Sequence, residues 1–210
     1  MKSSISKDKI AVWLFFGIFL ILGLTIAKDY GAHLDEFNSH DFGVRWYQYT
    51  VHVIAHGGPL VPREKEITHD IIHGPAVEMS FAFLADLLHL KDSRAIILLR
   101  HYGTWLLFFI SVIFFYLLCQ LHFKSRMWPL LGCLMLVLHP RIFANSFYNS
   151  VDMALLSFYI ISLYTLVRYL REKSLTMAVC HAFTCAILID IRLIGVVMPF
   201  LSCIFCCGIW

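Results

Sequence analysis

The fold follows from Ile10-Ala-Val-Trp-Leu-Phe-Phe-Gly-Ile-Phe-Leu-Ile-Leu-Gly-Leu-Thr-Ile-Ala27, a run of eighteen residues without a charge. As an α-helix it would extend about 27 Å, close to the thickness of the hydrocarbon core of a bilayer. Lys2, Lys7 and Lys9 precede it, and positive charge beside a first span is typical of the cytoplasmic side. We therefore expect a membrane anchor with a cytoplasmic N-terminus rather than a cleaved signal peptide, whose apolar core is usually shorter.

The rest of the chain shares this apolar character. Its 210 residues are 60% hydrophobic and only 15% charged, with a mean hydropathy of +0.74 and a formal net charge of +3. A soluble domain carries about 25% charged residues, so part of this apolar surface is expected to face lipid. The composition argues against a soluble enzyme or a disordered chain. The small net charge argues against a nucleic-acid partner.

Five further apolar segments are expected to cross the membrane. They are 103–121, 127–143, 153–170, 175–189 and 193–210. Pro140 should kink or end the second of these five. Basic residues gather in 122–126 and 168–173, at every second connection, which agrees with a cytoplasmic N-terminus. The expected fold is all-α, a polytopic helical membrane protein of about six transmembrane helices that form one domain over 1–210.

The segment 28–94, between the first two spans, is the polar part of the chain. It carries 16 of the 31 charged residues and 7 of the 11 histidines. The alternation of spans makes it a large first extracytoplasmic loop. Within this loop, 76–90 fits an amphipathic helix at the membrane interface. Glu78 and Asp86 are expected on the polar face of that helix rather than in a catalytic site.

Two polar motifs are candidates for chemistry. Asp35 and Glu36 are adjacent carboxylates just outside the first span, a position that suits general-base catalysis. The second motif is His139-Pro-Arg-Ile-Phe-Ala-Asn-Ser-Phe-Tyr-Asn-Ser-Val-Asp152, which is rich in hydrogen-bonding groups and returns to the same side of the membrane. Asp152 also fits the N-terminal turn of a helix, and the two roles are compatible.

These motifs resemble the GT-C superfamily of polytopic glycosyltransferases, in particular bacterial relatives of the dolichyl-phosphate-mannose protein mannosyltransferases (glycosyltransferase family 39). The carboxylate pair is similar to that of the family's first outer loop, and 139–152 to its second. Asp190-Ile-Arg-Leu-Ile-Gly195 resembles a later arginine-and-glycine segment. Members of the family are usually longer, so the chain is similar to their N-terminal half.

The resemblance implies an inverting transfer of a sugar from a polyprenyl-phosphate donor to an acceptor hydroxyl on the outer face of a membrane, here expected to be a bacterial plasma membrane. The chain would be such an enzyme or a truncated piece of one. Asp35 would be the base, with Glu36 and Asp152 as further catalytic acids. A divalent cation (Mg or Mn), if used, would bind these three acids. The implied substrate-binding residues are Arg141, His139, Asn149 and Arg192, with the two arginines facing the lipid phosphate.

Two other classes of protein stay open. His52 and His56 are four residues apart, as are His69 and His73, which is a spacing of metal ligands on a helix. It would suit a membrane-bound metal-dependent oxidoreductase with histidine boxes, although such sites usually face the cytoplasm. The third class is a non-catalytic membrane component. Iron or zinc bound to the purified protein would distinguish the oxidoreductase from the other two.

Overall fold

A computed structural model of the chain describes residues 7–57 and 73–208, which are helical and contain no β-strand. Among them, three helices are long and apolar enough to cross a membrane: α1 (Lys7–Ile26, extended by a 3-10 turn η1 at Ala27–Asp29), α4 (Ser93–Gln120) and α7 (Ser150–Glu172). The expected all-α fold and the membrane character are confirmed at this level. Lys2 lies outside the described residues.

The third predicted span is broken. Helix α5 (Met127–Val137) and helix α6 (Pro140–Tyr148) meet at a bend of 69°. Pro140 occupies the first turn of α6, where its missing N–H costs nothing, and the His139 ring accepts a hydrogen bond from the Ile142 amide at 3.4 Å. The expected effect of Pro140 is confirmed. The bent pair counts as one span at most.

The last two predicted spans are short. Helix α8 (Leu175–Ile191) has 17 residues and α9 (Val197–Gly208) has 12, separated by the 3-10 turn η2 (Leu193–Val196). A helix needs about 20 residues to cross a bilayer. The described residues therefore contain three candidate spans, or four with the bent pair, and the six predicted spans are not shown.

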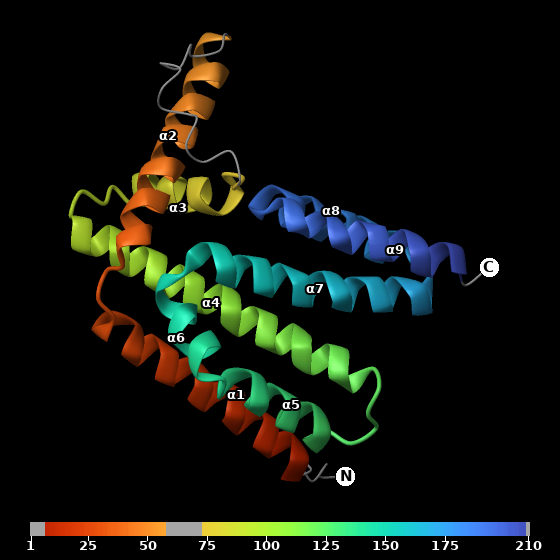
Figure 1. Cartoon of the computed structure of the whole chain (residues 1–210). Helices are drawn as coiled ribbons and strands as arrows, with labels where there is room; N and C mark the ends of the chain where they lie inside the picture. Colours follow the sequence, from red (N-terminus) through yellow and green to blue (C-terminus); the bar gives the residue numbers. More distant parts are fainter. Residues whose placement is uncertain (1–6, 58–72, 209–210) are drawn as a thin grey trace, which may run out of the picture.

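The helices form a bundle with two distinct ends (Figure 1). The N-terminus, the α4–α5 connection and the end of α7 lie at one end, together with the basic residues of 122–126 and 171–173. The end of α1, the starts of α2 (Leu34–His56) and α4, and the α6–α7 junction lie at the other, which we call the polar end. Helix α2 projects out of the bundle and α3 (Ala76–Leu87) lies across it.

Trp105 of α4 is the centre of the bundle core. Its indole ring is fully buried and stacks on Phe147 of α6, with a centroid distance of 4.9 Å and an interplanar angle of 1°. Phe19 of α1 packs against the same indole in a T-shaped arrangement, with the ring centroids 4.7 Å apart. A Cβ at Gly23 would overlap the indole, so this glycine lets α1 approach α4. Aromatic stacking therefore joins α1, α4 and the bent pair.

The segment 28–94 is not an extended loop, because α2 and α3 occupy most of its described part. The polar face of α3 turns inward: Glu78, Ala82 and Ala85 are buried, whereas Phe83 and Leu87 are exposed. The expectation that Glu78 lies on a solvated face is wrong. Its small alanine neighbours allow close packing, and a buried partner on α4 balances its charge. Asp86 is exposed, as expected, and accepts a hydrogen bond from Tyr47 at 2.6 Å.

The crossing of α2 and α3 depends on Gly43. A Cβ at this position would overlap the backbone carbonyl of Glu78, which cannot move aside as a side chain could. We expect Gly43→Ala to destabilise the fold by about 1–3 kcal/mol, the usual cost of overpacking. Gly17→Ala in α1 is the matched control, because nothing lies within 4 Å of its Cβ position. Thermal unfolding in detergent compares them, and equal melting temperatures would contradict the close crossing.

Candidate functional site

The first turn of α2 is fixed by hydrogen bonds that its own sequence provides. The His33 ring accepts from the Asp35 amide at 3.3 Å, while the Glu36 carboxylate accepts from the His33 amide at 2.8 Å. This is a capping box, which satisfies amides that have no partner within the helix. The adjacent carboxylates predicted from the sequence therefore both lie in the first turn of one helix, where negative charge is favourable.

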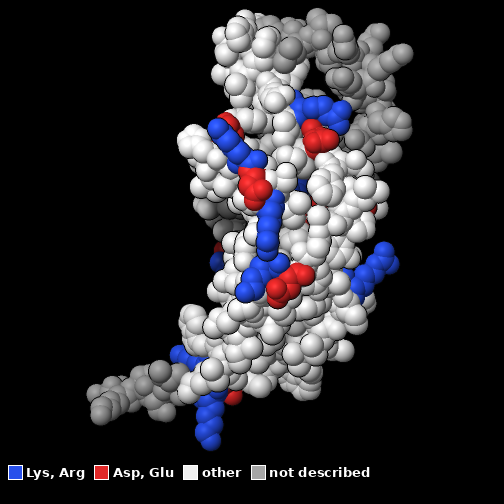
Figure 2. Space-filling view, turned by 90° about the vertical axis from the view of Figure 1, so that its left-hand side faces the viewer, with Lys and Arg blue, Asp and Glu red and all other residues white. Residues whose placement is uncertain are grey.

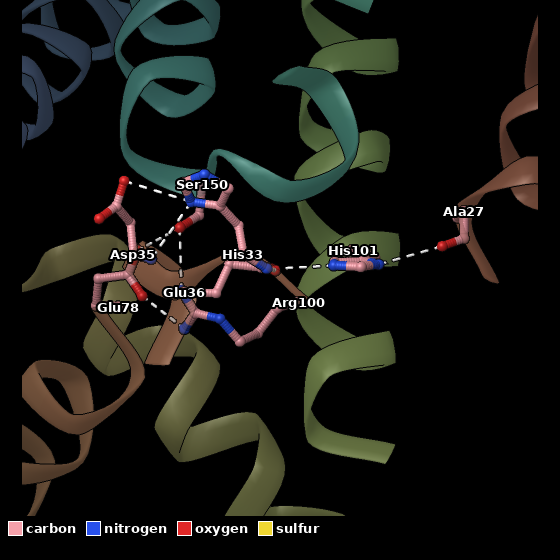
Figure 3. Close-up of polar contacts among 8 residues, drawn as sticks. All are labelled: Ala27, His33, Asp35, Glu36, Glu78, Arg100, His101 and Ser150. Carbon is pink, nitrogen blue, oxygen red and sulfur yellow. Dashed lines mark hydrogen bonds and ion pairs between the residues drawn. The ribbon is translucent and has the colours of Figure 1, made fainter. Parts of the chain in front are cut away.

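Glu36 points into the protein. Its side chain is buried, and its Oε1 lies 3.0 Å from His101 Nε2 of α4. The other ring nitrogen, His101 Nδ1, lies 3.2 Å from the carbonyl oxygen of Ala27 (Figure 3). The imidazole thus joins the end of α1 to the start of α2 through α4. Glu36 holds the first turn of α2 in position.

Asp35 points the other way. Its side chain is 82% exposed and its Oδ2 lies 3.4 Å from His33 Nδ1. His33 in turn stacks on Tyr148 at the end of α6, with the ring centroids 5.5 Å apart. Asp35 is therefore an exposed carboxylate on a firmly attached helix end, and it is accessible to a substrate from outside the bundle.

A second buried cluster joins α3, α4 and α7. Arg100 Nη1 of α4 lies 2.6 Å from Glu78 Oε2 of α3, and both side chains are almost completely buried. The Ser150 hydroxyl at the start of α7 donates to Glu78 at 2.5 Å and accepts from Arg100 at 3.1 Å (Figure 3). The Arg100 guanidinium also lies 5.3 Å from the ring centroid of Phe81. The cluster ties three helices together.

His40 of α2 lies close to this cluster. Burial lowers the pKa of His40, and the charge of Arg100 lowers it further, although the nearby acids Asp41 and Glu78 act in the opposite direction. The net effect keeps the imidazole neutral at pH 7. A neutral ring leaves the charge balance of the Glu78–Arg100 pair undisturbed.

Sequence reasoning did not identify Arg100 or His101, and it included Ser150 only as a member of the polar segment 139–152. The predicted second span begins at Gly103, whereas α4 begins at Ser93, where the Asp92 carboxylate caps the Ala95 amide at 3.2 Å. The sequence does contain a signal for the first two residues, since an Arg-His pair stands directly before an apolar run. A charged side chain at membrane depth needs a partner within the protein.

The third cluster contains Asp152, Asn149 and Arg192. Asn149 caps α7 by accepting from the Asp152 amide at 3.1 Å, and its side-chain amide donates to the Asp152 carboxylate at 2.9 Å. Arg192 Nη2 lies 2.7 Å from Asp152 Oδ1. Asp152 therefore lies in the first turn of α7, as the sequence analysis expected. Asp190 accepts from the Ala76 amide at 2.8 Å and so caps α3 rather than pairing with Arg192.

Arg141 and His139 lie at the α5–α6 bend. His139 is the cap of α6, and both side chains are exposed. Arg141 makes no ion pair with any residue in the described part of the chain. Its guanidinium is thus available to an anion, unlike that of Arg192.

The proposed metal ligands do not gather. Over residues 7–57 and 73–208, no group of three His, Cys, Asp or Glu side chains could hold a metal ion. Asp35, Glu36 and Asp152 therefore do not form a cation site with one another. His52 and His56 stack with ring centroids 4.5 Å apart, without a third ligand in that part of the chain. His69 of the second histidine pair lies outside the described residues.

Figure 2, which looks onto the left-hand side of Figure 1, shows acidic and basic side chains close together along the middle of this face, with further basic side chains at its edges. Comparisons of the chain with protein-family models, with curated proteins and with solved structures found no match.

The Glu78–Arg100 pair allows a direct test of the buried cluster. We expect Glu78→Gln to destabilise the protein by about 3–5 kcal/mol, because it leaves the Arg100 charge buried without a partner. Glu172→Gln is the control: its pair with Arg168 has the same 2.6 Å separation but is partly exposed, so its loss should change stability little. Chemical denaturation in detergent measures both, and similar losses would mean that the buried pair does not hold the polar end together.

Proposed function

We propose that the chain is a membrane glycosyltransferase, or the N-terminal part of one, that transfers a sugar from a polyprenyl-phosphate donor to an acceptor hydroxyl on the outer face of the membrane. The observation that carries the proposal is the geometry of Asp35. It is an exposed carboxylate at the polar end of an apolar bundle, on a helix end that Glu36 and His101 hold in place. A general base needs this combination of access and fixed position.

In this proposal Asp35 accepts the proton of the acceptor hydroxyl. The acceptor oxygen attacks the anomeric carbon of the sugar, and the bond to the lipid phosphate breaks, so that the phosphate leaves with the bonding electrons. A single displacement of this kind inverts the anomeric centre and needs no covalent enzyme intermediate. The hydrogen bond from the Asp35 amide to the His33 ring would fix the backbone from which the carboxylate projects. Glu36 would act as a positioning residue, because it is buried against His101.

The leaving phosphate needs positive charge, since negative charge develops on it as the bond breaks. Arg141 is the better candidate of the two predicted arginines, because Arg192 is already paired with Asp152. His139 and Asn149 would contribute indirectly by capping α6 and α7. A Mg or Mn ion, if the reaction uses one, would need substrate oxygens beside a single acid of the protein, because the three acids do not converge.

The topology belongs to the same proposal. The chain would cross a bacterial plasma membrane with its N-terminus in the cytoplasm. The bent α5–α6 pair would serve as one span, and α8 and α9 would complete the set of six. The polar end would then face outward, as transfer to an external acceptor requires.

Asp35→Asn keeps the size of the side chain but removes the base. We expect it to lower sugar transfer by about 10²-fold, the scale of general-base loss. Transfer from polyprenyl-phosphate-linked hexoses is measured in vesicles that contain the chain. Asp29→Asn changes another exposed acid at the same end of the bundle and should leave transfer unchanged. Full activity of Asp35→Asn would move the base elsewhere, with Asp152 the next candidate.

Single cysteines in a cysteine-free background test the topology. Cysteines at positions 35 and 152 should react with a membrane-impermeant maleimide on intact cells, while those at 124 and 173 should react only after permeabilisation. We expect this pattern because the connections rich in basic residues alternate with the other connections between the apolar segments, and basic connections are typically cytoplasmic. Labelling of position 35 only after permeabilisation would exclude transfer to an external acceptor.

A further inference from the structure

A cleft of about 280 Å³ lies at the polar end, between the α1–α2 connection and the first turns of α4. Two cations, Lys28 and Arg94, line it on either side. Its remaining walls are mainly apolar and include Phe37, Ile97 and Leu98. The predicted candidate residues Asp35, Arg141 and Arg192 do not line the cleft, although Phe37 lies on the same helix as Asp35.

The two cations have no acidic partner in the part of the chain that the structure describes. Neither Lys28 nor Arg94 forms an ion pair or a side-chain hydrogen bond there, although both are exposed. Two arginines near this end are compensated, since Arg100 pairs with Glu78 and Arg192 with Asp152, whereas Arg141 has no acidic partner among the described residues. Two uncompensated cations that face one cleft repel each other, and an anion between them would relieve the repulsion.

The cleft lies where two apolar runs begin. The uncharged run of α1 ends directly before Lys28, and a short apolar stretch, 95–99, follows Arg94 in α4 before the buried Arg100 and His101. Both transitions from polar to apolar sequence therefore meet at the same cleft, which is the pattern expected at the boundary between lipid head groups and hydrocarbon. Ile97 and Leu98 continue along α4 from Arg94 toward the apolar part of the bundle.

We propose that this cleft binds the phosphate group of a membrane lipid between Lys28 and Arg94, with the hydrocarbon chain of the lipid against Ile97 and Leu98. The arginine would offer a planar pair of N–H donors to the phosphate, and the lysine a compact charge opposite it. The apolar wall explains why the ligand is a lipid rather than a free anion. The inference rests on residues other than those of the proposed transfer reaction, so it stands whether or not the chain transfers a sugar.

Native mass spectrometry of the full chain in detergent micelles tests the proposal, with polyprenyl phosphate, phosphatidylglycerol and inorganic phosphate titrated separately. We expect one molecule of a lipid phosphate to bind the chain, and the lipid with the higher affinity identifies the source of the phosphate. Lys28→Gln and Arg94→Gln should each weaken that binding about tenfold, the scale of one charge-assisted hydrogen bond. Inorganic phosphate should bind far more weakly, because it makes no contact with the apolar wall.

Lys91→Gln is the matched control. Lys91 is exposed near the start of α4 but lies outside the cleft, so its replacement removes the same charge without removing a proposed ligand. Lipid affinity should be unchanged in this variant. Equal losses in all three variants would mean that only net charge attracts the lipid, and unchanged affinity in Lys28→Gln and Arg94→Gln would overturn the proposal. Inorganic phosphate binding as tightly as the lipids would also overturn it.

Discussion

The polar end of this protein depends on the ion pair between Glu78 and Arg100. In lipid, apolar helix surfaces gain little by leaving their surroundings for one another, so packing and polar contacts must hold helices together. The pair supplies such a contact at the point where α3, α4 and α7 meet, and the Ser150 hydroxyl forms a hydrogen bond with each of the two charged groups. A buried charge without its partner is costly, which disfavours any arrangement that separates the two side chains. The ion pair between Glu78 and Arg100 therefore helps to fix the position of α3.

The position of α2 depends on a similar buried contact between an acidic and a basic side chain. Glu36 and His101 form a buried pair that reaches the carbonyl oxygen of Ala27, so the chain direction is fixed where it leaves α1. The two buried pairs come from neighbouring residues of α4, Arg100 and His101. One turn of α4 thus positions both α2 and α3, and with them the exposed carboxylate of Asp35. The candidate site lies on helices whose positions are set by buried charges together with close packing at Gly43.

The sequence predicts the apolar helices well, but it does not predict α2 (Leu34–His56), and it predicts the partners of the helices poorly. Apolar runs of sufficient length identify α1, α4 and α7, and Pro140 identifies the bend between α5 and α6, because both signals are local. The inward face of α3 was missed, since its direction depends on Arg100, which lies far from Glu78 in the sequence. Asp152 shows the same limit: its helix-terminal place is a local property, but its pairing with Arg192 requires the packing of α7 against α8.

The bend at Pro140 also constrains how this region enters a membrane. A helix of eleven residues rises about 16 Å, roughly half of a hydrocarbon core, so α5 is too short to insert as an independent span. Backbone amides at the bend need partners once they leave water, and the His139 side chain provides one of them. Insertion of α5 is therefore coupled to that of α6, and the bent pair needs the protein surface of α4 and α1 to pack against.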